Sequence, residues 1–144
     1  MTTVCYRAGV LAADSQATMG GLKMPTEPKI IISGGRLIGA AGDATAINKF
    51  TAFISGKGKK PKLAKGEEFS AVVIDKDGHI DHWDEGMEPD RITLPFFAIG
   101  SGDELAIGAM EMGATAVQAV EVAIKWDAAS GGPVVSRKIE ELMK

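Results

Sequence analysis

Strand-like and helix-like segments occupy separate parts of this chain, and that separation limits the folds it can adopt. Short apolar runs divided by glycine-containing turns make up the first part and recur around Asp75–Gly78, whose Asp-Gly pair is a strong hairpin signal. Apolar residues at helical spacing follow Gly42-Asp43 and then dominate only the last third. Because strands and helices do not alternate one by one, the pattern predicts antiparallel sheets layered with helices, an α+β fold.

The boundaries of the expected elements follow from turn and capping residues. The predicted strands are Thr2–Arg7, Val10–Asp14, Lys29–Ile32, Arg36–Ala41, Phe69–Ile74, His79–Trp83 and Ile92–Ile99, with a short return at Val134–Ser136. The predicted helices run from an N-cap at Asp43 to Gly56, over Asp103–Met112, and from a capping box at Thr115 to Gly131-Gly132-Pro133. Residues Glu85–Asp90 are expected to form a loop. Several strands are apolar at every position, so both faces of the sheets should be covered.

Composition narrows the class of protein further. The chain has 144 residues, of which 45% are hydrophobic and 24% charged, with a net charge of −3, and this suits one globular domain over 1–144 rather than a nucleic-acid binder. Its one cysteine, Cys5, excludes an internal disulfide framework and a multi-cysteine metal site, and a buried inert thiol is expected. With no long apolar run and no visible signal peptide, we expect a cytoplasmic protein without a membrane partner.

The second residue offers a specific chemistry. If Met1 is removed, Thr2 carries a β-hydroxyl and a free α-amine on the same residue. The amine has an ordinary pKa of about 7.7–8.0, so at neutral pH a fraction of it can accept the hydroxyl proton. This is the N-terminal-threonine form of a nucleophile and its base. A Met-Thr start is also common in chains with no such activity.

Several short blocks follow Thr2 in order. They are Ala12-Ala13-Asp14-Ser15-Gln16-Ala17-Thr18, Lys29, Gly42-Asp43, Gly100-Ser101-Gly102 and Asp127-Ala128-Ala129-Ser130-Gly131-Gly132. With these blocks the chain resembles the β-subunits of the proteasome and their bacterial relative HslV, the N-terminal-nucleophile (Ntn) hydrolases, from Thr2 to about Pro133. The resemblance implies the four-layer αββα sandwich of Ntn hydrolases. Here its helix layer should be shortened, since the connector after Gly56 leaves no room for a full second helix.

The resemblance also implies a role for each matched residue. Thr2 would be the nucleophile, and Lys29 would lie beside its hydroxyl and lower the pKa of that group. Asp14 would keep Lys29 charged and oriented. Gly42 would offer its backbone N–H to the oxyanion at the start of the first helix. Thr18 would hold an extended substrate strand through its backbone.

Three further residues would surround the terminal amine, namely Ser101, Asp127 and Ser130. Each matched residue has an ordinary structural reading as well. Asp14 and Lys29 could form a surface ion pair, and Gly42-Asp43 a plain strand-to-helix turn. Ser101 could cap a helix, and the stretch after Asp127 could be a helix terminus.

The function predicted from the sequence is therefore a threonine-type endopeptidase that cuts unfolded polypeptide and needs neither a metal ion nor an organic cofactor. The resemblance implies a homo-oligomeric ring of six or seven subunits and a possible ATP-dependent unfoldase partner. Phe50, Phe53 and Met110 are candidates for contacts between subunits or for the core. A non-catalytic shell protein and a small-molecule amidase of the same fold are the alternatives.

Two other features invite a functional reading. His79 and His82 are predicted on opposite faces of a strand, and with no third ligand in view a zinc site is not expected. The connector 57–66 contains five lysines, at positions 57, 59, 60, 62 and 65. It is expected to be either a solvated loop or a docking surface for an acidic partner.

Overall fold

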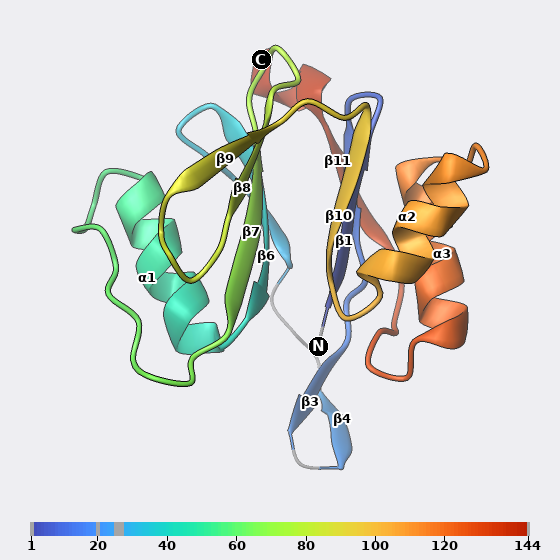
Figure 1. Ribbon diagram of the computed structural model, residues 1–144, viewed down its shortest axis with the longest axis horizontal. Coiled ribbons are helices and arrows are strands. Elements are labelled where there is room, and N and C mark those ends of the chain that lie inside the picture. The colour runs from blue at the N-terminus through green and yellow to red at the C-terminus, as the bar shows by residue number, and fades with distance from the viewer. Residues whose placement is uncertain (1, 20, 25–27, 144) are drawn as a thin grey trace.

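Two antiparallel sheets pack face to face, and helices cover their outer faces (Figure 1). The computed structural model describes residues 2–19, 21–24 and 28–143. The strands are β1 (Thr3–Arg7), β2 (Val10–Ala13), β3 (Ala17–Met19), β4 (Leu22–Met24), β5 (Ile30–Ser33), β6 (Arg36–Gly42), β7 (Phe69–Ile74), β8 (Ile80–Trp83), β9 (Pro89–Ile92), β10 (Phe96–Gly100) and β11 (Val135–Lys138). The helices are α1 (Ala44–Ile54), α2 (Asp103–Glu111), α3 (Ala116–Trp126) and the short 3-10 helix η1 (Ile139–Met143).

The layers run in the order α1, five-stranded sheet, four-stranded sheet, and the pair α2 and α3 (Figure 1). The four-stranded sheet has the order β10-β1-β2-β11, and the five-stranded sheet the order β5-β6-β7-β8-β9. Every pair of neighbouring strands is antiparallel. The mixed α+β class predicted from the sequence is confirmed.

The apolar core has three parts, one between each pair of layers. Val4, Leu11 and Val72 belong to the part between the two sheets, whereas Cys5 packs with α2 and α3 on the other face of β1. A third part lies under α1, around Phe50. Successive residues of a strand point to opposite faces, so β1 needs apolar side chains at consecutive positions. The expectation that both faces are covered is therefore correct.

The predicted hairpins and turns are present. β1 turns into β2 at Ala8-Gly9, where both residues have positive φ, and the Asp75–Gly78 turn joins β7 to the segment before β8. The predicted capping box at Thr115 is also confirmed, because its side chain accepts from the Gln118 N–H and the Gln118 side chain accepts from the Thr115 N–H. Burial raises the pKa of Cys5 to about 12, so this thiol is inert as expected.

One predicted strand was wrong. The apolar run Ile92–Ile99 is divided between β9, at the edge of the five-stranded sheet, and β10, at the edge of the four-stranded sheet. Pro95 lies in the crossing segment, where its missing N–H breaks no ladder. The predicted loop Glu85–Asp90 is correspondingly too long, since β9 begins at Pro89 and pairs with β8.

Two smaller expectations are also corrected, and for two residues the core alternative is confirmed. Asp43 occupies the N-cap position of α1 but makes no capping bond, and its carboxylate instead accepts from the Glu68 N–H at 2.6 Å. α3 ends at Trp126, before the predicted stop at Gly131. Phe50 and Met110 are fully buried within the chain, so neither can contact another subunit.

Other parts of the chain were left open or not expected. β3 and β4 form a separate two-stranded hairpin that projects from the body of the molecule (Figure 1). All five connector lysines are exposed, and residues 57–66 contain neither helix nor strand. α1 is therefore the only helix that covers the five-stranded sheet in the described part of the chain. No described helix has both the length and the apolar character needed to cross a membrane.

Arg7 joins the four-stranded sheet to the helix layer. From the end of β1 its guanidinium donates to the carbonyl oxygens of Met110, in the last turn of α2, and Ala114, just beyond it. It also lies over the Phe96 ring, 5.1 Å from the centroid. A cation at a helix C-terminus satisfies carbonyls that have no partner within the helix.

We therefore predict that Arg7→Met lowers the free energy of unfolding by about 2 kcal/mol, the usual size for hydrogen bonds to a charged group. Denaturant unfolding measures the change. The matched control is Arg137→Met, because Arg137 is exposed and pairs with the accessible Glu141. That control should change stability by less than about 0.5 kcal/mol. Equal losses in the two variants would contradict the role given to Arg7.

Candidate active site

A buried carboxylate lies at the end of β2. Asp14 is 0% exposed and accepts four hydrogen bonds. Its Oδ1 accepts from the Thr3 N–H at 2.9 Å and from the Lys29 ammonium at 3.0 Å, and its Oδ2 accepts from the N–H groups of Gly131 at 3.0 Å and Gln16 at 3.3 Å. A charge without access to water needs such partners. The alternative of an exposed surface pair is excluded.

Lys29 directly precedes β5, and its side chain extends toward this carboxylate. Its ammonium donates to Asp14 Oδ1 and, at 2.6 Å, to the backbone oxygen of Gln16, and its side chain is 9% exposed. Burial lowers the pKa of Lys29, and the hydrogen bond and charge of Asp14 only partly oppose that shift. The result is a confined cation whose pKa lies below its ordinary value.

Thr2 precedes β1 and is 7% exposed. Its carbonyl oxygen accepts from the Ser101 N–H at 2.8 Å, and the Ser101 hydroxyl oxygen lies 3.4 Å from it. Gly100 makes this approach possible, because a Cβ at that position would lie 1.8 Å from the Thr2 oxygen. Thr2 is thus attached at its carbonyl to the turn between β10 and α2.

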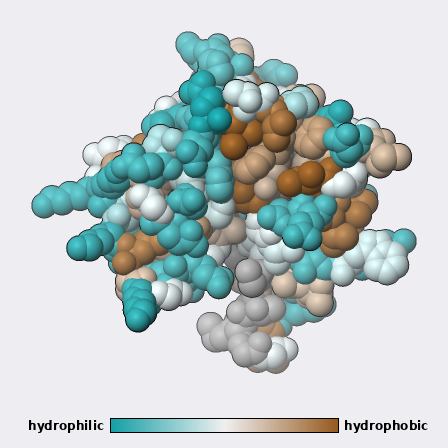
Figure 2. Space-filling view, in the orientation of Figure 1, coloured by the Kyte–Doolittle hydropathy of each residue, from teal (hydrophilic) through white to brown (hydrophobic). Residues whose placement is uncertain are grey.

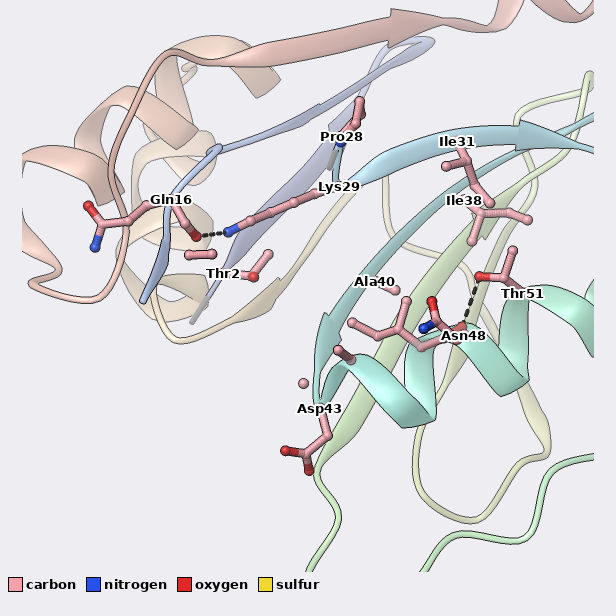
Figure 3. A pocket seen from close by; sticks show the side chains of 14 residues that line it. Thr2, Gln16, Pro28, Lys29, Ile31, Ile38, Ala40, Asp43, Asn48 and Thr51 are labelled. Atoms are coloured by element: carbon pink, nitrogen blue, oxygen red, sulfur yellow. Dashed lines mark hydrogen bonds between the residues drawn. The ribbon is translucent and has the colours of Figure 1, made fainter. Parts of the chain in front are cut away.

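Thr2 and Lys29 both line a pocket of about 510 Å³ between β5, β6 and α1 (Figure 3). In Figure 3 they lie on one side of the pocket, and Ile38, Asn48 and Thr51 lie on the other. Most of the side chains on this second side are apolar, among them those of Ile31, Ile38 and Ile47. The Thr51 hydroxyl does not change this character, because it donates to the Ile47 carbonyl of its own helix at 2.9 Å. The pocket therefore combines a hydroxyl, an ammonium and an apolar wall.

Gly42 also lines this pocket, at the junction of β6 and α1. Its φ is +119°, and a Cβ here would lie 2.2 Å from the Glu68 carbonyl oxygen. The glycine is required both by its backbone conformation and by the close approach of Glu68.

The three residues predicted around the terminal amine form one hydrogen-bonded group. Asp127 is the C-cap of α3, and its Oδ2 accepts from the hydroxyls of Ser101 at 2.7 Å and Ser130 at 2.6 Å. Its Oδ1 accepts from the Ala129 N–H at 3.3 Å. Burial raises the pKa of Asp127, but these hydrogen bonds outweigh it, and the net pKa lies below its ordinary value.

The sequence reasoning missed one residue of this group. Thr3 is 0% exposed, and its hydroxyl lies 2.7 Å from the Ser130 hydroxyl. A hydroxyl residue directly before the run Val4-Cys5-Tyr6 was the available signal. Thr18, in contrast, lies in β3 opposite Lys23, and its side chain lies outside the described part of the chain.

The histidines have separate partners. His79 Nδ1 lies 2.8 Å from Asp75 Oδ2 in the turn before β8, and His82 Nε2 lies 2.9 Å from the Ser70 hydroxyl. Asp75, Asp77 and His79 place their ligand atoms within 4.8 Å of one another. Asp75 Oδ1, however, accepts from the N–H groups of Asp77 and His79, so this exposed group holds the turn.

Comparisons with known proteins give a structural relation. No protein-family model and no curated protein matches the chain. Among solved structures it is similar to that of BPH from Thiobacillus denitrificans in complex with epoxomicin, with a TM-score of 0.72 and 21% identity. The match covers 94% of this chain and 96% of that one. The two proteins therefore share a fold.

Asp14 gives a stability prediction that does not depend on any activity. Asp14→Asn keeps the shape but leaves Lys29 without its counter-charge and turns an amide toward N–H donors. We expect the free energy of unfolding to fall by about 3–5 kcal/mol, as for other broken buried pairs. Denaturant unfolding of Asp81→Asn is the control, since Asp81 pairs with the exposed Arg91. A loss below about 1 kcal/mol in Asp14→Asn would show that the buried pair is dispensable.

Proposed function

We propose that this chain, over 1–144, is a single-domain Ntn hydrolase acting as a threonine-type endopeptidase, with Thr2 as its nucleophile after removal of Met1. One observation carries the proposal: Thr2 lines the same pocket as Lys29, whose ammonium is held by the buried Asp14 carboxylate. The shared fold supports it, because the similar protein was solved in complex with epoxomicin.

The reaction would proceed through an ester on Thr2. The α-amine accepts the hydroxyl proton, and the freed oxygen attacks the carbonyl carbon of a peptide bond. The Lys29 ammonium favours the negatively charged form of the hydroxyl, and the Gly42 N–H stabilises the oxyanion of the tetrahedral intermediate. The amine then returns its proton to the leaving nitrogen, so the C–N bond breaks and the Thr2 ester remains.

A water molecule would complete the cycle. The α-amine accepts one of its protons, the hydroxide attacks the ester carbonyl, and the Thr2 oxygen leaves with a proton from the amine. In this proposal the ionised Asp127, with Ser101 and Ser130, positions the amine and tunes its proton affinity. The backbone of Thr18, in the projecting β3–β4 hairpin, holds an extended unfolded polypeptide beside the pocket.

The chemistry calls for an enclosed chamber, since an open peptidase would digest its host. We propose a homo-oligomeric ring of six or seven copies, supplied by an ATP-dependent unfoldase in the cytoplasm. Apolar side chains gather over β10 and α2 in Figure 2, in contrast to the hydrophilic surface around α1. The exposed apolar residues of the helix pair and its ends are Leu105, Ile107, Met112 and Trp126. They are the proposed contacts between copies.

Thr2 provides the direct test. Thr2→Ala should abolish cleavage of unstructured peptides without unfolding the protein, and Thr2→Ser should keep part of the activity because it retains a hydroxyl and an amine. Epoxomicin should inhibit the wild-type protein. Peptide cleavage is measured alongside intact mass, which should show that native protein has lost Met1.

The matched control is Thr45→Ala, an exposed threonine of α1 that does not line the pocket, and it should leave the rate unchanged. Cleavage by Thr2→Ala, or retention of Met1 in active protein, would refute the nucleophile. A wild-type protein that cleaves no peptide would favour the shell-protein alternative.

Assembly is tested separately. Light scattering at micromolar concentration should give a mass six or seven times that of the 15.1 kDa chain, or twice that if two rings stack. Replacing two exposed apolar residues together, as in Met112→Glu with Trp126→Glu, should shift the distribution to smaller species. A wild-type monomer of 15.1 kDa would remove the chamber and favour a small-molecule amidase.

A further inference from the structure

We propose that Thr3 is a positioning residue that holds Thr2 in its reactive place, an inference that rests on the proposed function. Thr3 is the first residue of β1 and is wholly buried, although it carries a hydroxyl. Burying a hydroxyl is unfavourable unless it is hydrogen-bonded. The partners of Thr3 therefore indicate what the hydroxyl does.

The direction of each bond follows from the available protons. The Ser130 hydroxyl has one hydrogen, which it donates to Asp127 Oδ2 at 2.6 Å. In its 2.7 Å contact with Thr3, Ser130 must therefore accept, and the Thr3 hydroxyl donates. A chain of bonds thus runs from Thr3 through Ser130 to a carboxylate with a lowered pKa.

Thr3 connects this series of hydrogen bonds to Asp14, the other carboxylate of the site. Its backbone N–H donates to Asp14 Oδ1 at 2.9 Å, and the same oxygen accepts from the Lys29 ammonium. One residue is therefore bound to Asp14 through its main chain and to Asp127 through its side chain and Ser130.

The peptide unit between Thr2 and Thr3 is fixed at both of its polar groups. Its carbonyl, from Thr2, accepts from Ser101, and its N–H, from Thr3, donates to Asp14. The Thr3 hydroxyl anchors the adjoining Cα–Cβ bond as a third point. Three anchors restrict rotation of the residue that carries the nucleophile.

The space for this hydroxyl is kept by a neighbouring glycine. A Cβ at Gly102 would lie 2.2 Å from Thr3 Oγ1 and 2.8 Å from the Cβ of Ala123. The φ of Gly102 is −97°, which any residue can adopt, so room rather than backbone conformation requires the glycine. Gly102, the second glycine of the Gly-Ser-Gly block, thus leaves room for the Thr3 hydroxyl.

The test compares Thr3→Val, which keeps the shape and the N–H but removes the hydroxyl, with Thr3→Ser, which restores it. Small misplacements of reacting groups reduce rates by about 10²-fold, so we expect kcat in Thr3→Val to fall by about 10- to 100-fold with KM unchanged. Thr3→Ser should recover most of that loss. Thermal unfolding confirms that both variants are folded.

Amide hydrogen exchange, followed by NMR, gives a readout that needs no catalysis. The residue-3 amide should exchange at least several-fold faster in Thr3→Val than in Thr3→Ser, because the bond to Asp14 is less well held. An unchanged kcat in a folded, active Thr3→Val overturns the proposal, whatever the exchange rate. A lower kcat with unchanged exchange would also overturn it, since the hydroxyl would then act on the chemistry directly.

The proposed function fails in a different way. If wild-type protein cleaves no peptide, there is no reaction for Thr3 to serve, and both ideas fall together. If the wild-type protein is active and kcat is the same in Thr3→Val and Thr3→Ser, the endopeptidase proposal stands and the positioning role is wrong.

Discussion

The buried charge of Asp14 is the constraint on which this end of the molecule depends. A carboxylate without solvent is tolerated only where donors replace water, and here the donors come from β1, from Lys29 before β5 and from the loop after α3. These segments are far apart in the chain. The Asp14 carboxylate therefore fixes the positions of these segments relative to one another. Because Thr2 and Lys29 line the pocket, the same carboxylate also helps to fix the shape of the pocket.

Much of the fold could be predicted from local pattern. Glycine turns, a capping box and apolar strands with two buried faces are each encoded within a few residues, and they located nearly every strand and helix. Sheet membership is not local. The run from Ile92 to Ile99 is uniformly strand-like, and only the packing of two sheets decides that it must be divided at Pro95. The β3–β4 hairpin was missed because each of its strands has only three residues, too few to establish an alternating pattern.

The candidate site could be predicted in its membership but not in its connections. Ordered blocks identified Asp14, Lys29, Asp127 and Ser130, and the structure brings them together around the first strand. Which hydroxyl groups form hydrogen bonds with one another depends on side-chain packing across the sheet and the helix layer. The spacing of these residues along the sequence does not reveal it. Gly102 illustrates the point, because the hydroxyl for which it leaves room belongs to Thr3, near the start of the chain.

The strand order has a consequence for when this site can exist. β1 pairs with β10 and β2 with β11, so the sheet that carries Thr2 is completed only by strands from the last third of the chain. During synthesis the N-terminus emerges first, yet its partners emerge last. Until β10 and β11 have been synthesised, β1 and β2 can pair only with each other in this sheet. The candidate site around Thr2 therefore cannot be complete before β10 and β11 have been synthesised.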